Sequence, residues 1–240
     1  MKILHEFVPT RKFLKFAEAV EDLVDGWNIT DSAAGIPAPS GTAVGCVLKT
    51  KYPDKTVIPI FVLNYKSSVE AGGLALAADA VGLDGLVLTM GDMPKYGEPI
   101  KMLNSSEEAR DFLRTVIRLK NLKLGCLLTA RRPIEELTKR ARDPWDFVFF
   151  MRLEDESFPK LEQLAKECRR LNKPLYTYFL VGTSKNAEMI KMIGWPIAAT
   201  MNRVESVVAT LDGLVDGVIA TCAGDYEGDK EMLKRLQKFR

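Results

Sequence analysis

Acidic residues at the ends of apolar segments are the groups in this sequence best suited to chemistry. Glu6 lies between Leu4 and Phe7 in an apolar stretch, where a carboxylate is uncommon unless it is paired or used. Burial disfavours the charged carboxylate and raises its pKa toward the range of a general acid. Glu6 is therefore a candidate catalytic acid, and a salt bridge with Arg11 or Arg131 is the alternative.

A second acid, Asp92, lies in the segment DGLVLTMGDMP, where an apolar run leads directly into Gly91. Glycine lets a backbone approach a ligand closely, and Pro94 stiffens the exit from the segment. We expect Asp92 to lie at the mouth of a site, and an aspartate that caps a turn is the alternative. Lys139 and Arg140, with Arg142, could clamp a phosphate, and solvated helix charges are the alternative.

The scaffold that must position these groups alternates short apolar runs with segments of helical period along its whole length. Strands are predicted at 3–7, 27–30, 57–63, 85–89, 123–128, 147–151, 175–179 and 217–221, and helices near 11–24, 40–51, 68–81, 105–120, 133–142, 158–171, 184–193, 203–213 and 227–239. This alternation predicts a parallel sheet, because parallel neighbours need a crossover connection. Eight such units favour a (β/α)8 TIM barrel. The competing doubly wound sheet would carry a glycine-rich turn after its first strand, where this chain reads EFVPTRK.

In a barrel of this kind, functional residues lie where the strands end and the following loops begin. Glu6 ends the first strand and Asp92 follows the fourth, so we expect the two carboxylates to face each other across one mouth. The ends of the strands place further candidates at the same mouth: Thr30, Asp31, Asn64, Gly91, Thr129, Met151, Arg152 and Tyr178.

The composition is that of a globular protein and excludes several classes. Of 240 residues, 47% are hydrophobic and 28% are charged, unlike disordered or collagen-like chains. The near balance of 34 basic and 32 acidic residues argues against a duplex-binding protein, and one histidine with four dispersed cysteines argues against a metal cluster. No apolar run is long enough for a membrane span or a signal peptide, so we expect a cytoplasmic protein. No linker or repeat divides the chain, which predicts one domain over residues 1–240.

Two blocks of the sequence resemble the methylenetetrahydrofolate reductases. The opening HEFVPTR, which contains Glu6, is similar to that family's F-E-F-x-P-P strand, which is followed by a basic residue. The segment GLDGLVLTMGDMP, which contains Asp92, is similar to the family's G-D-x-P pattern after the fourth strand. The segments NITDSAAGIPAPSG and FFMRLEDESFPKLEQLAKEC also resemble the corresponding parts of that family.

The resemblance implies a barrel oxidoreductase of one-carbon metabolism that reduces a 5,10-methylene-tetrahydropterin, of the folate or methanopterin type, to the 5-methyl form. It implies that Glu6 is the general acid, that Asp92 contacts the pterin, and that NAD(P)H donates the hydride directly or through FAD. Because Met90 stands where the family has a flavin-facing arginine, the flavin-free route stays open. The resemblance assigns cofactor contacts to Thr30, Asp31, Gly91, Thr129, Lys139 and Arg140, and substrate contacts to Asn64, Met151, Arg152 and Tyr178.

Two other function classes stay open. One is a non-redox pterin-binding or complex subunit on the same barrel that has lost the flavin site, and the other is an unrelated barrel lyase or aldolase. A Schiff-base aldolase would place a lysine at a strand end, where the sixth strand offers Met151 and Arg152. The expected partners are the pterin and a nicotinamide nucleotide, with no nucleic acid and no membrane, and a homo-oligomer is left open.

Overall fold

The computed structural model describes residues 1–100 and 103–240 and contains all eight predicted strands. A further strand, β8, has only two residues and pairs with the end of β7 at Val181 and Gly182. Two residues are too few to show a hydrophobic period, so the sequence pattern does not reveal this strand. The strands are β1 (Lys2–Phe7), β2 (Gly26–Ile29), β3 (Thr56–Val62), β4 (Leu86–Thr89), β5 (Leu124–Thr129), β6 (Phe147–Met151), β7 (Leu175–Gly182), β8 (Ala199–Thr200) and β9 (Gly217–Thr221).

The helices follow the predicted segments with three differences. The first segment breaks after α1 and resumes as a 3-10 turn at Glu21–Leu23, and the fourth ends in a π-helical turn over Leu113–Ile117. The seventh helix begins after Ser184, because the Asn186 side chain holds the preceding turn by accepting the Thr183 amide at 2.8 Å. None of the described helices is long and apolar enough to cross a membrane. The helices are α1 (Phe13–Glu18), α2 (Gly41–Lys51), α3 (Ser68–Val81), α4 (Ser106–Phe112), α5 (Ile134–Arg142), α6 (Phe158–Arg170), α7 (Ala187–Ile193), α8 (Val204–Leu211) and α9 (Tyr226–Leu236).

The fold class is a (β/α)8 TIM barrel, as the sequence predicts. Strands and helices alternate along the chain, and the strand pairs are parallel. The described residues form two compact units. The first unit contains Met1–Glu6, Val20–Gly26 and Leu127–Arg240, and the second contains Phe7–Ala19 and Trp27–Cys126.

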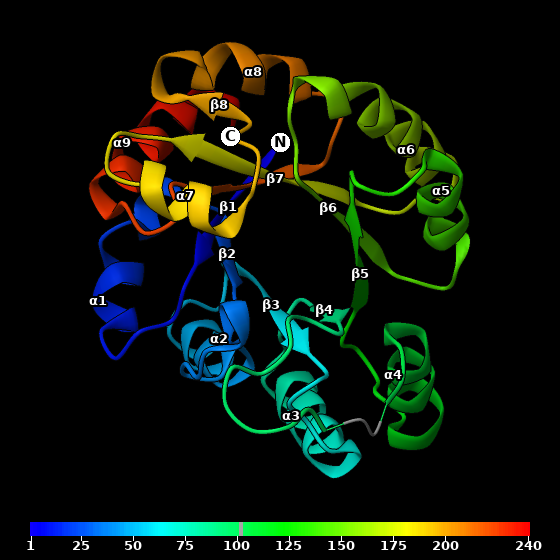
Figure 1. The fold of residues 1–240 in the computed structure, drawn as a ribbon. Coiled ribbons are helices and arrows are strands. Elements are labelled where there is room, and N and C mark those ends of the chain that lie inside the picture. Colours follow the sequence, from blue (N-terminus) through cyan, green and yellow to red (C-terminus); the bar gives the residue numbers. More distant parts are fainter. Residues whose placement is uncertain (101–102) are drawn as a thin grey trace. The chain divides into compact units, whose positions relative to one another are not determined.

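The first unit carries strands in the order β6, β7, β9 and β1. Its interior contains a row of aromatic rings, in which Phe149 lies 5.4 Å from Tyr176 and 6.1 Å from Tyr178 between ring centroids. Helices α5 and α6 lie side by side on the outside of this unit (Figure 1). Aromatic rings pack best in such tilted and edge-on pairs, which makes this interior rigid.

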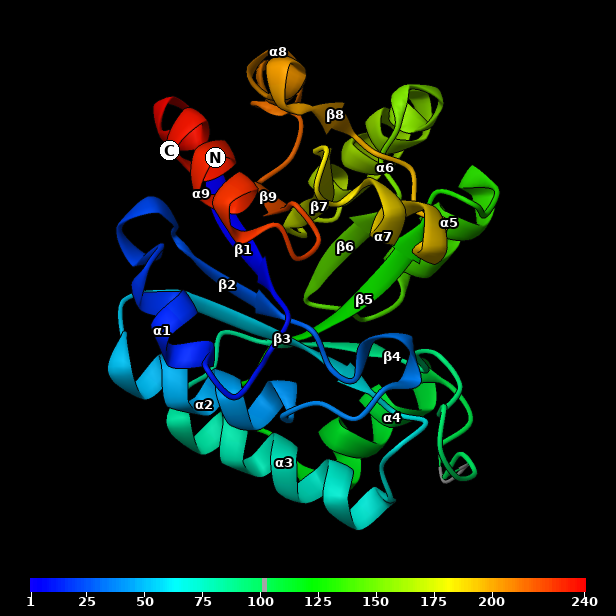
Figure 2. The ribbon, with the colours of Figure 1, turned by 60° about the vertical axis from the view of Figure 1, so that its left-hand side comes forward.

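The second unit pairs β3 with β4, and β4 with the first half of β5. Helices α2 and α3 lie beside each other, and α2 packs on β3 (Figure 2). The approach of α2 to β3 is close at Gly45, where an added Cβ would lie 2.7 Å from Cγ of Pro59. The small residues of α2 therefore let the helix lie directly on the strand.

Candidate functional site

Glu6 is the next-to-last residue of β1, lies in the first unit, and has a half-buried side chain. Desolvation raises its pKa to about 7, and this rise is partly offset by a hydrogen bond from the Thr221 hydroxyl and by nearby His5. Asp229 adds a smaller upward contribution. The predicted rise in pKa is thus confirmed, and burial is its main cause. A carboxyl group that titrates near neutral pH can both donate and accept a proton.

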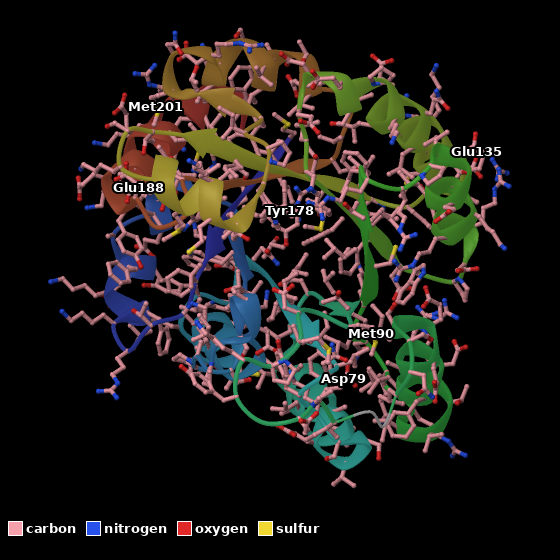
Figure 3. The ribbon with its side chains drawn as sticks, viewed as in Figure 1. Asp79, Met90, Glu135, Tyr178, Glu188 and Met201 are labelled. Carbon is pink, nitrogen blue, oxygen red and sulfur yellow. The ribbon has the colours of Figure 1, made fainter. Side chains whose placement is uncertain are left out.

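Tyr178, on β7, is within electrostatic range of Glu6 on β1. Burial and the neighbouring Glu6 carboxyl raise the pKa of the Tyr178 hydroxyl well above its usual range, so this group stays protonated. Its ring packs edge-on against Trp195, with centroids 6.0 Å apart. Figure 3 labels Tyr178 on its strand. A hydroxyl that stays protonated can donate a hydrogen bond to a substrate oxygen.

Arg152 follows β6 in the left-handed backbone conformation, with a φ of 69°. A non-glycine residue in this region carries strain of about 1–3 kcal/mol, and such residues concentrate at functional sites. Its guanidinium donates to the carbonyl of Gly194 and lies 5.9 Å from the ring centroid of Trp195. Burial lowers the pKa of Arg152, nearby Arg131 lowers it further, and Glu154 opposes the change.

On the other face of β1, His5 lies against helix α9. Its Nε2 is 3.3 Å from Oδ2 of Asp229, and both side chains are buried. The other oxygen of Asp229 accepts the backbone amide of Cys222 at 2.6 Å. Asp229 therefore joins α9 to the end of β9 and to β1, the two strands that carry Thr221 and Glu6. Sequence reasoning missed this pair, because the two residues are far apart in the chain.

The candidates at and after β5 differ in their exposure and in their contacts. Arg140 donates to the backbone carbonyl of Leu127 at 3.1 Å, whereas Lys139 is exposed on α5. The guanidinium of Arg140 is thus used to attach α5 to β5, and a phosphate clamp formed by Lys139 and Arg140 stays a prediction. Thr129 and Met151 are half-buried at the ends of β5 and β6.

Asp31, in the second unit, forms a buried ion pair that the sequence does not reveal. Lys66 donates to Oδ2 of Asp31 at 2.5 Å and to the carbonyl of Val62 at 2.8 Å. Asp31 also accepts the amides of Val62 at 3.2 Å and Gly41 at 3.4 Å. Asp31 therefore fastens the start of α2 to the end of β3. Next to it, the Thr30 hydroxyl oxygen is buried without a hydrogen-bond partner among the residues that the structure describes.

Asp92 is exposed and ties three loops of the second unit together. Its Oδ2 accepts the amide of Ala34 at 3.1 Å, and its carbonyl accepts the hydroxyl of Tyr65 at 2.6 Å. The side chain of Asn64 donates to the carbonyl of Gly91 at 3.4 Å. Asp92 thus caps a turn in this structure, which is the alternative that the sequence leaves open.

Gly91 offers a direct test of this loop. Its φ is 74°, and an added Cβ would lie 2.4 Å from a methyl carbon of Val62. Gly97 has a similar φ of 76°, but nothing lies within 4 Å of an added Cβ there. We expect Gly91→Ala to lower the free energy of unfolding by roughly 1–3 kcal/mol more than Gly97→Ala does, because only Gly91→Ala adds a clash to the backbone strain. Urea denaturation of the two variants measures the difference, and equal losses would contradict the clash.

A cavity of about 840 Å³ lies in the first unit, beyond the ends of β7 and β9. Its lining includes Asp225, Glu227 and Glu231, against one basic side chain, Lys185. The Thr183 hydroxyl donates to Asp225 at 2.8 Å across the base of the turn. None of the site residues predicted from the sequence lines this cavity. Over the described ranges, no group of three or more histidine, cysteine or acidic side chains is arranged to hold a metal ion.

Fold and site together define a (β/α)8 barrel with a carboxyl group of near-neutral pKa at the end of its first strand. No protein-family model and no curated protein matches the chain. Among solved structures, the tryptophan synthase subunit alpha from Campylobacter jejuni is 16% identical, with a TM-score of 0.61, over 100% of this chain and 95% of that chain. A mutant tryptophan synthase alpha-subunit from Pyrococcus furiosus is 12% identical, with a TM-score of 0.66, over 99% and 97%. An Aquifex aeolicus VF5 structure is 15% identical, with a TM-score of 0.63, over 99% and 92%. These similarities show the fold.

The prediction of a methylenetetrahydrofolate reductase is wrong. The solved structures that share the fold include tryptophan synthase alpha subunits, which are a different family. This finding overturns both the reductase activity and the pterin-binding subunit that was its alternative. The G-D-x-P motif suggested the wrong family for a physical reason. Gly91 adopts a positive φ and Asp92 accepts a backbone amide, and turns in unrelated barrels can need both. FAD, NAD(P)H and the pterin depended on that resemblance and stay predictions, as does the expectation that Glu6 and Asp92 face each other.

Proposed function

We propose that this chain is a barrel lyase in which Glu6 is the general acid–base group. The observation that carries the proposal is the half-buried Glu6 carboxyl, whose pKa is about 7, at the end of β1. Functional residues of TIM barrels lie at these strand ends. The shared fold with tryptophan synthase alpha subunits supports a lyase over a reductase. Fold alone does not define an activity, and the side chains of the site determine the chemistry.

The proposed step is the cleavage of a carbon–carbon bond in a β-hydroxy carbonyl compound. The Glu6 carboxylate accepts the proton of the β-hydroxyl group, and the α–β carbon bond breaks to give an aldehyde or ketone and an enolate. The electron pair of the broken bond moves to the enolate oxygen, which the Tyr178 hydroxyl stabilises by a hydrogen bond. Glu6 then returns the proton to the α-carbon. Thr221, by donating to the carboxyl, holds it in position between these two transfers.

The proposal is tested with a panel of β-hydroxy carbonyl compounds, by following the released aldehyde or ketone by proton NMR. We expect the wild-type protein to cleave at least one member, and Glu6→Gln to be slower by roughly 100-fold or more, because general acid–base catalysis contributes that much. Glu135→Gln, on the exposed face of α5, is the matched control and is expected to keep the wild-type rate. Cleavage that persists in Glu6→Gln would show that another group moves the proton. The absence of cleavage throughout the panel would contradict the proposed reaction.

A further inference from the structure

Two arginines lie next to each other where β5 and β6 end. The amide of Ala130 donates to the carbonyl of Met151 at 3.1 Å, so the residues that follow, Arg131 and Arg152, leave neighbouring strands side by side. In the part of the chain that the structure describes, neither guanidinium forms an ion pair with a carboxylate. Nearby Glu154 opposes the lowering of the Arg152 pKa, and no ion pair joins the two. Two neighbouring arginines that form no carboxylate ion pair attract an anion.

Trp195 and Tyr178, together called the aromatic wall, lie between this pair of arginines and Glu6. Arg152 is held in place by the carbonyl of Gly194 and by the ring of Trp195, 5.9 Å away. Trp195 in turn packs edge-on against Tyr178, and the Glu6 carboxyl acts electrostatically on the Tyr178 hydroxyl. Contacts therefore run from the Arg152 cation through two aromatic side chains, and the second of these senses the charge of Glu6.

We propose that Arg131 and Arg152 bind the anionic group of the substrate, a carboxylate or a phosphate, and that Trp195 and Tyr178 pack against its flat, unsaturated skeleton. The placement of the reacting carbon at Glu6 rests on the proposed function, whereas the anion site does not. A guanidinium presents a planar fork of donors that matches carboxylate and phosphate oxygens. The strained backbone of Arg152 orients that fork along the aromatic wall.

The cavity beyond β7 and β9 is the other place where an anion could bind, since TIM barrels often hold phosphate in the loops after their last two strands. Here that cavity is lined by Asp225, Glu227 and Glu231, against Lys185 alone. Like charges repel in such a partly enclosed space, so this lining disfavours an anion. The arginines at the ends of β5 and β6 are therefore the better site.

The test uses tryptophan fluorescence, because Trp195 is half-buried whereas Trp27 and Trp145 are fully buried. Benzoate and phenyl phosphate are titrated as probes, with benzyl alcohol as the neutral probe and inorganic phosphate as the anion without a ring. We expect a saturable change with benzoate or phenyl phosphate at millimolar concentrations, and none with benzyl alcohol. The better of the two anions identifies the group that the site prefers. Trp195→Phe is expected to remove the fluorescence change and to keep the thermal stabilisation that the same anion produces.

Single variants distinguish the contribution of Arg131 and Arg152 to anion binding from the general effect of removing a positive charge. We expect Arg152→Met to weaken binding of the aryl anion about tenfold and Arg131→Met about fivefold, because each removes charge-assisted hydrogen bonds. Arg132→Met is the matched control, since Arg132 is exposed and lies 3.8 Å from Glu136. Equal binding of benzyl alcohol, equal weakening by Arg132→Met, or no saturable change with either anion would overturn the anion site. Binding of inorganic phosphate as tight as that of phenyl phosphate would overturn the role of the aromatic wall.

The experiment also distinguishes the anion site from the proposed function. Binding is measured without turnover, and Glu6→Gln is expected to bind the aryl anion as the wild-type protein does. Anion binding in a protein that cleaves no member of the substrate panel would keep the site and reject the lyase. Cleavage without anion binding would support the lyase and reject the anion site.

Discussion

Near pH 8, the Glu6→Gln variant is expected to be more stable than the wild-type protein by about 3 kcal/mol. The folded protein raises the pKa of Glu6 from 4.5 to about 7, mainly by desolvation. Each unit of pKa difference between the folded and unfolded states corresponds to about 1.4 kcal/mol. Above both pKa values the wild-type protein must keep a charged carboxylate in a desolvated site, and the neutral amide of glutamine removes this cost.

The sign of the pH dependence follows from proton binding. Between about pH 4.5 and pH 7, the folded state holds a proton on Glu6 that the unfolded state has lost, so the stability due to this group falls as the pH rises. Urea denaturation at about pH 4, 6 and 8 should therefore show nearly equal stabilities at the lowest pH and a widening advantage of Glu6→Gln above it. The exposed-site variant Glu135→Gln should show no such trend. A constant difference at all three pH values would mean that the pKa of Glu6 is not raised.

If replacing Glu6 raises the free energy of unfolding, Glu6 does not serve the stability of the fold and must have another role. Active sites commonly contain groups that destabilise the folded state, because catalysis needs them in a desolvated position. If Glu6→Gln is both more stable and inactive, a general folding defect cannot explain the loss of activity. The stability measurement thus strengthens the interpretation of the cleavage assay.

The second large effect is expected at Lys66, whose removal should lower the free energy of unfolding by about 3–5 kcal/mol. Lys66 and Asp31 are about 5% and 4% exposed and are joined at 2.5 Å. Lys66→Met leaves the Asp31 carboxylate buried with only backbone amides as partners. For a chain of this length, the melting temperature should fall by roughly 10 °C.

A double variant checks that the loss comes from the unpaired charge. Asp31→Asn combined with Lys66→Met removes both charges, and we expect it to be more stable than Lys66→Met alone, since neutral replacements of buried pairs are tolerated better. Lys51→Met breaks the exposed pair with Glu18 and should have little effect, because water screens such pairs. If the double variant is no more stable than Lys66→Met, the lost packing of the lysine side chain, and not its charge, explains the result.

Most of the fold could be predicted because its signals are local. Strands that are buried on both faces form continuous apolar runs, and β6, with the sequence FVFFM, is an example. The predicted start of the seventh helix at Ser184 is wrong, because the Asn186 side chain fixes that turn by donating to the carbonyls of Val181 on β7 and of Cys222 directly after β9. Contacts of this kind leave no period in the sequence.

The residues of the candidate site also fall into two groups: those with a local signal in the sequence and those that depend on distant partners. Glu6 could be found from the sequence, because an acid inside an apolar strand is a local anomaly, and the rise of its pKa follows from burial. Trp195 could not be found, because its role depends on Arg152 and Tyr178, which other strands bring to it. Lys66 was missed for the same reason, since its partner Asp31 is 35 residues away.

The sequence by itself determined the alternation of strands and helices, and with it the barrel and the strand ends where chemistry can occur. It also determined the chemical type of each side chain at those ends. Only the tertiary structure decided which of these side chains meet, because charge pairing, desolvation and ring packing depend on distances between segments far apart in the chain. The short G-D-x-P block illustrates the difference: its residues satisfy a turn, and their contacts, not their pattern, show what they do.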